Sequence, residues 1–350
     1  MTCKAGSATL FFVMKKLNKI SKKLQFLRLL SVFFFSFSYQ IESSFALEPV
    51  TFATDWKAQA EQGGFYQAKA LGLYEKAGLN VVIRGGGPGI NIPQLLGANA
   101  IDFAMGSNSF ILLNMVQAGV PAKAVMAAFQ KDPQVLITHE RDDIQSISDM
   151  KDKPIMIADA SINAFWVWMR ARYGFSNKQI RKYTFNLAPF IVDKNAIQQG
   201  YATSEPYTIS KNGITPKVFL LSDEGYPSYA AMVIAQNKLI EEKPDIVQAF
   251  VNASIEGWRS YLMDDPTPGN QIILAANQDM TQDILDQAII QMRDRGLVIS
   301  GDALDKGIGT MTRNRWETFF TLMAQNGLYD MEMNWESAFT TKFVTKADSE

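Results

Sequence analysis

The chain has 350 residues, of which 47% are hydrophobic and 20% are charged, and its formal net charge at pH 7 is −1. This composition is typical of a folded globular protein and excludes a low-complexity or disordered chain. The chain has one cysteine, Cys3, and one histidine, His139. These counts exclude a disulfide framework and any zinc site built from several His and Cys ligands.

The N-terminal segment predicts export. Six basic residues between Lys15 and Arg28 precede the apolar stretch LLSVFFFSFSY, and SSFA follows, with Ser44 and Ala46 at the small-residue positions of a cleavage site. The apolar stretch is too short to cross a bilayer as a helix. We therefore expect a cleavable signal peptide over residues 1–46 rather than a membrane anchor, with Met14 as an alternative start.

Removal of residues 1–46 makes the remaining protein acidic. It takes away 7 of the 34 basic residues and 1 of the 35 acidic residues, which leaves 27 against 34 and a net charge of −7. No basic tract remains for nucleic acid or an anionic lipid surface. The sequence therefore predicts a free soluble protein of an oxidising compartment, which we expect to be a monomer and whose partners do not include nucleic acid.

Strand and helix patterns alternate from residue 49 onward. Apolar runs bounded by turn residues predict strands, and apolar residues at helical spacing predict helices. The predicted strands are 49–54, 79–87, 100–107, 122–129, 134–140, 155–159, 183–187 and 230–236. The predicted helices are 63–77, 91–99, 108–118, 161–173, 193–199 and 243–262, followed by a mostly helical remainder. This alternation predicts an α/β fold with parallel sheets that are covered on both faces.

The alternating pattern restarts once, which predicts two α/β lobes. The chain has natural crossing points near 134–140 and 224–232, where strand-like runs lie beside turn residues. We therefore expect a discontinuous first lobe, made of 47–136 and 228–350, and a second lobe made of 137–227. Ligands bind between such lobes and at the carboxyl ends of parallel strands.

The sequence offers little for catalysis. A Ser-His-Asp or Cys-His mechanism would have to use His139, which ends a strand beside Glu140 and Arg141 and is expected at the surface. The chain has no D-x-D-x-D-G calcium loop. We therefore expect a protein that is not an enzyme and that holds neither a metal nor a cofactor.

The glycine-rich sequence RGGGPGIN, residues 84–91, is a second candidate for function. It lacks the Gly-Lys-Ser/Thr ending of a phosphate-binding loop and does not satisfy G-x-G-x-x-G. One interpretation is a tight turn between a strand and a helix. The other is that glycines such as Gly86 let backbone N–H groups approach a small ligand.

Polar residues recur where predicted strands end. They are Asp55, Ser107, Asn108, Asp159, Ser161, Asn163 and Glu205. Each of them could simply cap the next helix, but their recurrence at several strand ends favours a ligand site. Trp166 and Trp168 lie on a predicted helix with other apolar residues and are expected in the core. Trp56 follows Asp55 at a strand exit, which suits stacking on a planar heteroaromatic ring.

The sequence as a whole resembles a known family. The matching segments are TDWKAQAEQGGFYQAKALGLYEKAGLNVVIRGGGPGIN, QLLGANAIDFAMG, GYATSEPY and AQNKLIEEKPDIVQAFVNASIEGW, and the similarity covers 48–265. They resemble the periplasmic substrate-binding proteins of nitrate/sulfonate/taurine-type ABC transporters, and more narrowly the branch related to thiamine-pyrimidine synthase. The resemblance implies a type II periplasmic-binding fold whose two lobes close over a pyrimidine-like ligand. It also implies an ABC permease and ATPase as partners.

The resemblance suggests a role for each candidate ligand residue. Trp56 would stack on the ring and Asp55 would accept a hydrogen bond from a ring amine. Asn108 and Glu205 would add hydrogen bonds in the plane of the ring. Ser161 or Asn163 would close from the second lobe, and Tyr66 would cover the site or pack in its helix.

Two alternatives remain. An oxyanion such as a sulfonate would need cationic donors, for which Arg84 is the one obvious candidate. A synthase that consumes its own histidine, with pyridoxal phosphate and iron, would need a cysteine cluster where this chain has GYPSYAAMV, and a histidine near MGSNSF. Both are missing, which argues against the synthase.

Overall fold

The computed structural model describes residues 46–87 and 89–344. From Leu47 onward the chain belongs to one compact unit. The predicted signal peptide, including Cys3 and Met14, lies outside the described residues apart from Ala46.

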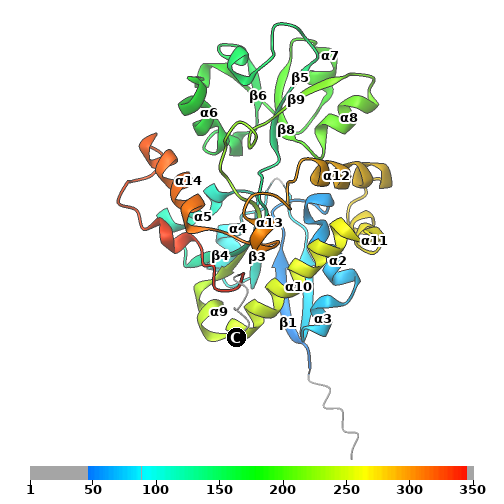
Figure 1. Ribbon diagram of the computed structural model, residues 1–350, viewed down its shortest axis with the longest axis vertical. Helices are drawn as coiled ribbons and strands as arrows, with labels where there is room; N and C mark the ends of the chain where they lie inside the picture. Colours follow the sequence, from blue (N-terminus) through cyan, green and yellow to red (C-terminus); the bar gives the residue numbers. More distant parts are fainter. Residues whose placement is uncertain (1–45, 88, 345–350) are drawn as a thin grey trace, which may run out of the picture. The chain divides into compact units, whose positions relative to one another are not determined.

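Two five-stranded sheets organise this unit (Figure 1). The first sheet has the strand order β2-β1-β3-β10-β4, and the second has the order β7-β6-β8-β5-β9. The strands of the first sheet are β1 (Glu48–Ala53), β2 (Leu79–Arg84), β3 (Phe103–Gly106), β4 (Ala122–Phe129) and β10 (Ala230–Gln236). Those of the second are β5 (Gln134–His139), β6 (Ile155–Ile157), β7 (Ile180–Lys182), β8 (Ile197–Tyr201) and β9 (Pro216–Leu220).

Helices connect the strands and follow β10. The α-helices are α2 (Gly63–Ala70), α3 (Leu73–Lys76), α4 (Ile92–Gly97), α5 (Ser109–Gln117), α6 (Phe165–Tyr173), α7 (Ala188–Val192), α8 (Glu205–Lys211), α9 (Asn237–Glu242), α10 (Pro244–Met263), α11 (Thr267–Ala276), α12 (Gln282–Asp294), α13 (Ala303–Lys306) and α14 (Arg313–Gln325). Short 3-10 turns are η1 (Ala60–Gln62), η2 (Ile147–Met150), η3 (Asp159–Ser161), η4 (Asn177–Gln179) and η5 (Trp335–Ala338).

The sheets are mixed rather than parallel. β1 pairs in parallel with β2 and β3, and β6 pairs in parallel with β7 and β8. However, β10 is antiparallel to β3 and β4, and β5 is antiparallel to β8 and β9. The expectation of purely parallel sheets is therefore wrong, because the strands that enter each sheet from the other one run in the opposite direction to their neighbours.

Each strand of the first sheet sends alternate side chains to opposite faces. Phe52 packs against Phe65 and Phe250, with ring centroids 4.8 and 5.2 Å away. Its neighbour Ala53 belongs to a second buried cluster, which includes Phe110. The sheet is therefore covered on both faces, as its apolar strand sequences predicted.

The paired glycines at the start of α2 allow close packing on α10. A Cβ atom on Gly64 would lie 2.2 Å from Cδ2 of Trp258, and one on Gly257 would lie 2.2 Å from the carbonyl oxygen of Gly64. Both contacts are far shorter than van der Waals distance, so only glycine fits. The packing of α2 against α10 therefore requires glycine at positions 64 and 257.

Three predicted elements differ from the observed ones. Residues 183–187, predicted as a strand, are irregular, and the strand in this region is β7, which begins three residues earlier. The predicted helix at 193–199 is wrong, because 197–201 form β8 and the helix α7 ends at Val192. The predicted helix at 63–77 is interrupted at Gly72, where φ is 64° and the chain turns between α2 and α3.

Candidate functional site

Two aromatic residues from different sheets face each other. Trp56 follows β1 and Phe185 follows β7, and their ring centroids are 5.0 Å apart with the planes at 51°. Phe185 is 49% exposed and has a φ of 62°. A residue with a Cβ rarely adopts this left-handed conformation, and such outliers cluster at ligand sites. Tyr183 also contacts Phe185, with ring centroids 5.3 Å apart.

Asp55, the residue before Trp56, supplies a buried carboxylate. Its Oδ2 accepts a hydrogen bond from the hydroxyl of Ser107, at the end of the neighbouring strand β3. Its Oδ1 is buried and has no hydrogen-bond partner. Burial raises the pKa of Asp55 to about 6, although the residue as a whole is partly exposed. The unpaired oxygen is an acceptor without a donor, which is costly in a buried position.

Glu61, in η1, supplies a second buried carboxylate. It accepts a hydrogen bond from the hydroxyl of Thr203, which follows β8 of the second sheet. Both residues are almost fully buried, at 3% and 2% exposure. Burial raises the pKa of Glu61, and the nearby charge of Glu205 raises it further. This hydrogen bond therefore links the two sheets inside a dry environment.

Glu205 supplies the third carboxylate from the first position of α8. Its Oε2 accepts from the backbone N–H of Tyr201 at 2.8 Å, and its Oε1 accepts from the hydroxyl of Tyr183 at 3.2 Å. Burial raises the pKa of Glu205. An acid in the first turn of a helix is stabilised by the helix dipole. We name the eight residues described so far the inter-sheet junction: Asp55, Trp56, Glu61, Ser107, Tyr183, Phe185, Thr203 and Glu205.

Among the described residues, no Lys or Arg side chain pairs with these three carboxylates. Within residues 46–87 and 89–344, none of the ion pairs or hydrogen bonds joins a Lys or Arg side chain to Asp55, Glu61 or Glu205. Arg84, the candidate for an oxyanion, lies exposed at the end of β2. The inter-sheet junction is therefore rich in acceptors and suits a ligand that donates hydrogen bonds.

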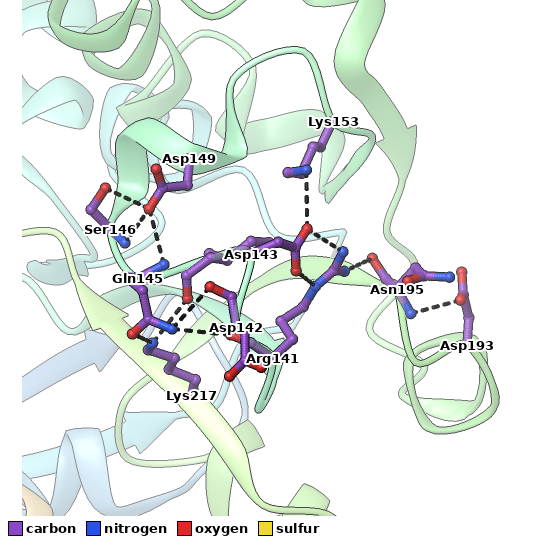
Figure 2. Close-up of polar contacts among 11 residues, drawn as sticks. Arg141, Asp142, Asp143, Gln145, Ser146, Asp149, Lys153, Asp193, Asn195 and Lys217 are labelled. Atoms are coloured by element: carbon purple, nitrogen blue, oxygen red, sulfur yellow. Dashed lines mark hydrogen bonds and ion pairs between the residues drawn. The ribbon is translucent and has the colours of Figure 1, made fainter.

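The cations that follow β5 are used elsewhere, in a polar cluster of the second sheet. Figure 2 shows Arg141 directed at Asp143, with two hydrogen bonds of 2.5 and 2.7 Å, and Lys153 at 3.2 Å from the same carboxylate. Arg141 also donates to the carbonyl of Asn195 at 3.1 Å. The guanidinium lowers the pKa of Asp143 to about 2. Arg141 and Lys153 are therefore both paired with Asp143 within this exposed cluster.

Other predicted ligand residues have local roles. Asn108 caps α5, because its Oδ1 accepts from the N–H of Phe110 at 3.2 Å. Gly86 donates its N–H to the carbonyl of Trp56 at 2.9 Å, and a Cβ there would lie 2.3 Å from the carbonyl oxygen of Thr54. Gly86 therefore permits the loop after β2 to lie close against residues 54–56, the segment that follows β1.

The remaining predicted residues divide by burial. Ser161 is buried at the end of η3, and Asn163 is exposed two residues later. Asp159 pairs with Lys182 at 3.1 Å on the surface. Tyr66 is buried in α2 and lines a groove of about 750 Å³ together with residues of β2 and α11. Contacts place none of these four in the inter-sheet junction.

The expectation that His139 lies at the surface is wrong. β5 is an inner strand, so its last residue remains covered. The Nε2 of His139 donates to the carbonyl of Phe190 at 2.8 Å, and the two rings stack with centroids 4.6 Å apart. Trp166 and Trp168 are buried in the core as predicted.

Sequence patterns did not indicate Phe185, Tyr183 or Glu61. Phe185 lies in an irregular segment that its apolar residues made strand-like, and no propensity scale marks an aromatic residue with positive φ. Glu61 lies two residues before Gly63, the first residue of α2, where an acid is ordinary. The one signal for it was its position in the stretch that starts with Asp55 and Trp56.

Two further findings limit the chemistry. Among the described residues, no three His, Cys, Asp or Glu side chains are arranged to hold a metal ion. No helix in the described part of the chain has the length and apolar character needed to span a membrane.

Known proteins resemble this chain in sequence and in fold. A family profile described as NMT1/THI5 like matches residues 59–268, more than half of the chain. The riboflavin-binding protein RibY of Chloroflexus aurantiacus is 24% identical over 318 residues, which cover 85% of this chain and 86% of that protein. A putative thiamine biosynthesis protein of Haemophilus influenzae is 22% identical over 252 residues, covering 65% and 79%.

Among solved structures, the periplasmic aliphatic sulphonate binding protein SsuA of Escherichia coli superposes with a TM-score of 0.62 at 13% identity. The match covers 83% of this chain and 97% of SsuA. The chain therefore has the periplasmic-binding-protein fold, which confirms the predicted fold class. A fold of this kind supports both binding and catalysis, so function has to be argued from the site.

Proposed function

The chain belongs to the NMT1/THI5-like family, as its sequence predicted, and we propose that it is the solute-binding component of an ABC importer in the periplasm. The first and second sheets would act as the two lobes. Ligand would bind more tightly when the lobes are closed and so shift the equilibrium toward the closed form. That form would then dock on the permease and ATPase.

The observation that carries the proposal is the aromatic pair beside buried carboxylates. Trp56 and Phe185 come from different sheets, so a ring held between them would favour closure. A sandwiched ring needs about 7 Å between its neighbours, two stacking distances of roughly 3.5 Å. Because the two centroids are 5.0 Å apart, the rings would separate by about 2 Å to admit a ligand ring.

The carboxylates favour a ring that carries N–H donors. The unpaired Oδ1 of Asp55 would gain a partner from a ring amine, which removes the cost of a buried acceptor. Glu61 and Glu205 would accept further donors at the edge of the ring. A pyrimidine-type thiamine precursor has this chemistry. The names of the two relatives support a heteroaromatic ligand of this kind, with riboflavin as a second candidate because of RibY.

An oxyanion ligand fits the junction less well. SsuA binds sulphonates, as its name states, and shares the fold. In this chain three buried carboxylates would repel a sulfonate, and Arg84 is exposed outside the junction. We therefore propose that the chain does not share the specificity of SsuA.

We also propose binding rather than catalysis. A synthase that consumes its own histidine would use His139, whose ring is stacked on Phe190 and bonded to its carbonyl. Incubation with pyridoxal phosphate and iron, followed by mass spectrometry of the intact protein, tests this point. An unchanged mass is expected, and a mass loss located at His139 would support the enzyme instead.

Calorimetry tests the proposed ligand class. The protein starting at Leu47 would be titrated with 4-amino-5-hydroxymethyl-2-methylpyrimidine, with riboflavin and with taurine. We expect one of the two heteroaromatics to bind and taurine to give no heat. Trp56→Ala should abolish binding and Trp56→Phe should retain part of it. Binding of taurine alone, or equal affinity of wild type and Trp56→Ala, contradicts the proposal.

A further inference from the structure

Two segments connect the sheets within residues 47–344. The first, residues 130–133, joins β4 of the first sheet to β5 of the second. The second, residues 221–229, returns from β9 to β10. Any movement of one sheet relative to the other must change the backbone in these segments.

One side chain of the C-terminal region bonds both connections. Arg315, in α14, donates from Nη2 to the carbonyl oxygen of Gln130 in the first connection. It also donates from Nη2 to Ser228 at 2.9 Å and from Nε to Pro227 at 2.9 Å, both in the second connection. A planar guanidinium with several fixed donors suits this bridging role, which a lysine ammonium cannot reproduce in the same geometry.

The surroundings hold Arg315 in place. Its Cζ lies 4.0 Å from the ring centroid of Tyr229, within cation–π range. The hydroxyl of Tyr229 accepts from the N–H of Thr312 at 2.9 Å. Burial lowers the pKa of Arg315, while Asp132 and Asp302 act in the opposite direction. The described ion pairs do not include Arg315, so its charge is directed at carbonyl oxygens.

The C-terminal region forms further hydrogen bonds with the first connection. The N–H groups of Gln130 and Lys131 both donate to the carbonyl of Leu297, at 2.7 and 3.0 Å. The side-chain Nε2 of Gln130 donates to the carbonyl of Thr310 at 2.9 Å. The start of the first connection is therefore fixed to the segment 297–315 by backbone and side-chain bonds alike.

We propose that Arg315 is a positioning residue of the hinge: by tying the two connections together, it sets how far and how readily the second sheet moves. Residues beyond 266 would thus control ligand capture without touching the ligand. The inference rests on the proposed function only in that it assumes movement of the two sheets. The bonds that carry it involve no ligand.

Single-molecule energy transfer tests the hinge directly. The chain has no cysteine after Cys3, so dyes can be placed on Lys178→Cys in the second sheet's half and Glu241→Cys in α9, both exposed positions. The protein starting at Leu47 would be measured without any ligand, as wild type, Arg315→Lys and Arg315→Met. Arg313→Met is the matched control, because Arg313 contacts Glu317, Glu336 and the ring of Trp335, none of which lies in either connection.

We expect a narrow transfer distribution for wild type and for Arg313→Met. Arg315→Met should broaden the distribution and add a low-transfer population, and Arg315→Lys should lie between the two. Far-UV circular dichroism confirms that each variant is folded; if Arg315→Met does not fold, Arg315→Lys decides. An unchanged distribution in the folded Arg315 variants overturns the inference. If wild type binds neither heteroaromatic, the proposed function is wrong, but the energy-transfer comparison still decides the role of Arg315.

Discussion

Thr203 donates a hydrogen bond to the buried carboxylate of Glu61, and the two residues lie in segments that follow strands of different sheets. Thr203 follows β8 of the second sheet, whereas Glu61 lies between β1 and α2 of the first. Two exposed contacts accompany this bond, because Tyr207 and Lys211 of α8 both donate to Asp283 of α12, at 2.8 and 2.7 Å. Exposed ion pairs contribute little to stability, so the buried bond is the stronger link between the sheets.

The first prediction concerns that bond. Thr203→Val should lower the free energy of unfolding by about 1–3 kcal/mol, because a buried acceptor loses its donor. Urea unfolding measures the change. Thr203→Ser keeps the hydroxyl and should retain most of the stability. An unchanged stability in Thr203→Val together with a loss in Thr203→Ser would show that the methyl group matters and the hydrogen bond does not.

The second prediction concerns the pH dependence of Asp55. Its folded pKa of about 6 lies above the ordinary value of 3.8, so between these values the folded protein binds more protons than the unfolded chain. The contribution of Asp55 to stability is therefore fully present below pH 3.8 and is lost as pH rises through 6. At pH 7.5 the loss is about 3 kcal/mol, from roughly two pKa units.

Asp55→Asn should therefore stabilise the ligand-free protein at pH 7.5 and have little effect at pH 4. Urea unfolding of wild type and Asp55→Asn at the two pH values measures this effect. Glu61 and Glu205 are present in both proteins, so their contributions cancel when the two free energies of unfolding are subtracted. The same substitution should weaken binding of the aminopyrimidine, because an acceptor is lost. If the substitution stabilises the protein less at pH 7.5 than at pH 4, the predicted direction of the pH effect is wrong.

The third prediction separates ligand binding from stability at Phe185. Phe185→Gly removes the ring but relieves a left-handed backbone that costs about 1–2 kcal/mol for a residue with a Cβ. The lost contacts with Trp56 and Tyr183 are worth about 0.5–1.5 kcal/mol each, so the gain and the loss are of similar size. Stability should therefore change little. Affinity should fall by roughly 5- to 150-fold, the equivalent of about 1–3 kcal/mol for one stacked ring.

Thermal unfolding and calorimetry together measure this separation. Val192→Ala is the matched control, because Val192 is an exposed apolar residue of the neighbouring helix α7 at 81% exposure. It should change neither quantity. An unaltered affinity in Phe185→Gly would remove Phe185 from the site.

The fourth prediction concerns the packing of α2. Gly64→Ala places a methyl group 2.2 Å from the indole of Trp258. Overpacking of this kind costs about 1–3 kcal/mol or more. Gly97→Ala is the control, because a Cβ at this position in α4 meets nothing within 4 Å and should stabilise the protein by about 0.5–1 kcal/mol. Chemical denaturation of both variants should give effects of opposite sign.

The sequence by itself determined the fold class and most element positions. Apolar runs such as 122–129 and 230–236 predicted β4 and β10 because strands that are buried on both faces must be apolar throughout. The amphipathic spacing of 243–262 predicted α10 for the same kind of reason. The sequence also indicated that Asp55 and Trp56 lie at a strand exit, because the end of a strand can be read from the residues around it.

Only the tertiary structure decided which residues meet. Phe185 faces Trp56 although about 130 positions separate them, and no local pattern encodes a contact of that range. The same holds for Thr203 with Glu61, and for Arg315 with Gln130 and Ser228. Residues such as Asn108 and Gly86 had the right chemistry for a ligand, but helix capping and close backbone packing use them first. The site depends on the path of the chain between the two sheets, and that path is fixed by packing over the whole unit.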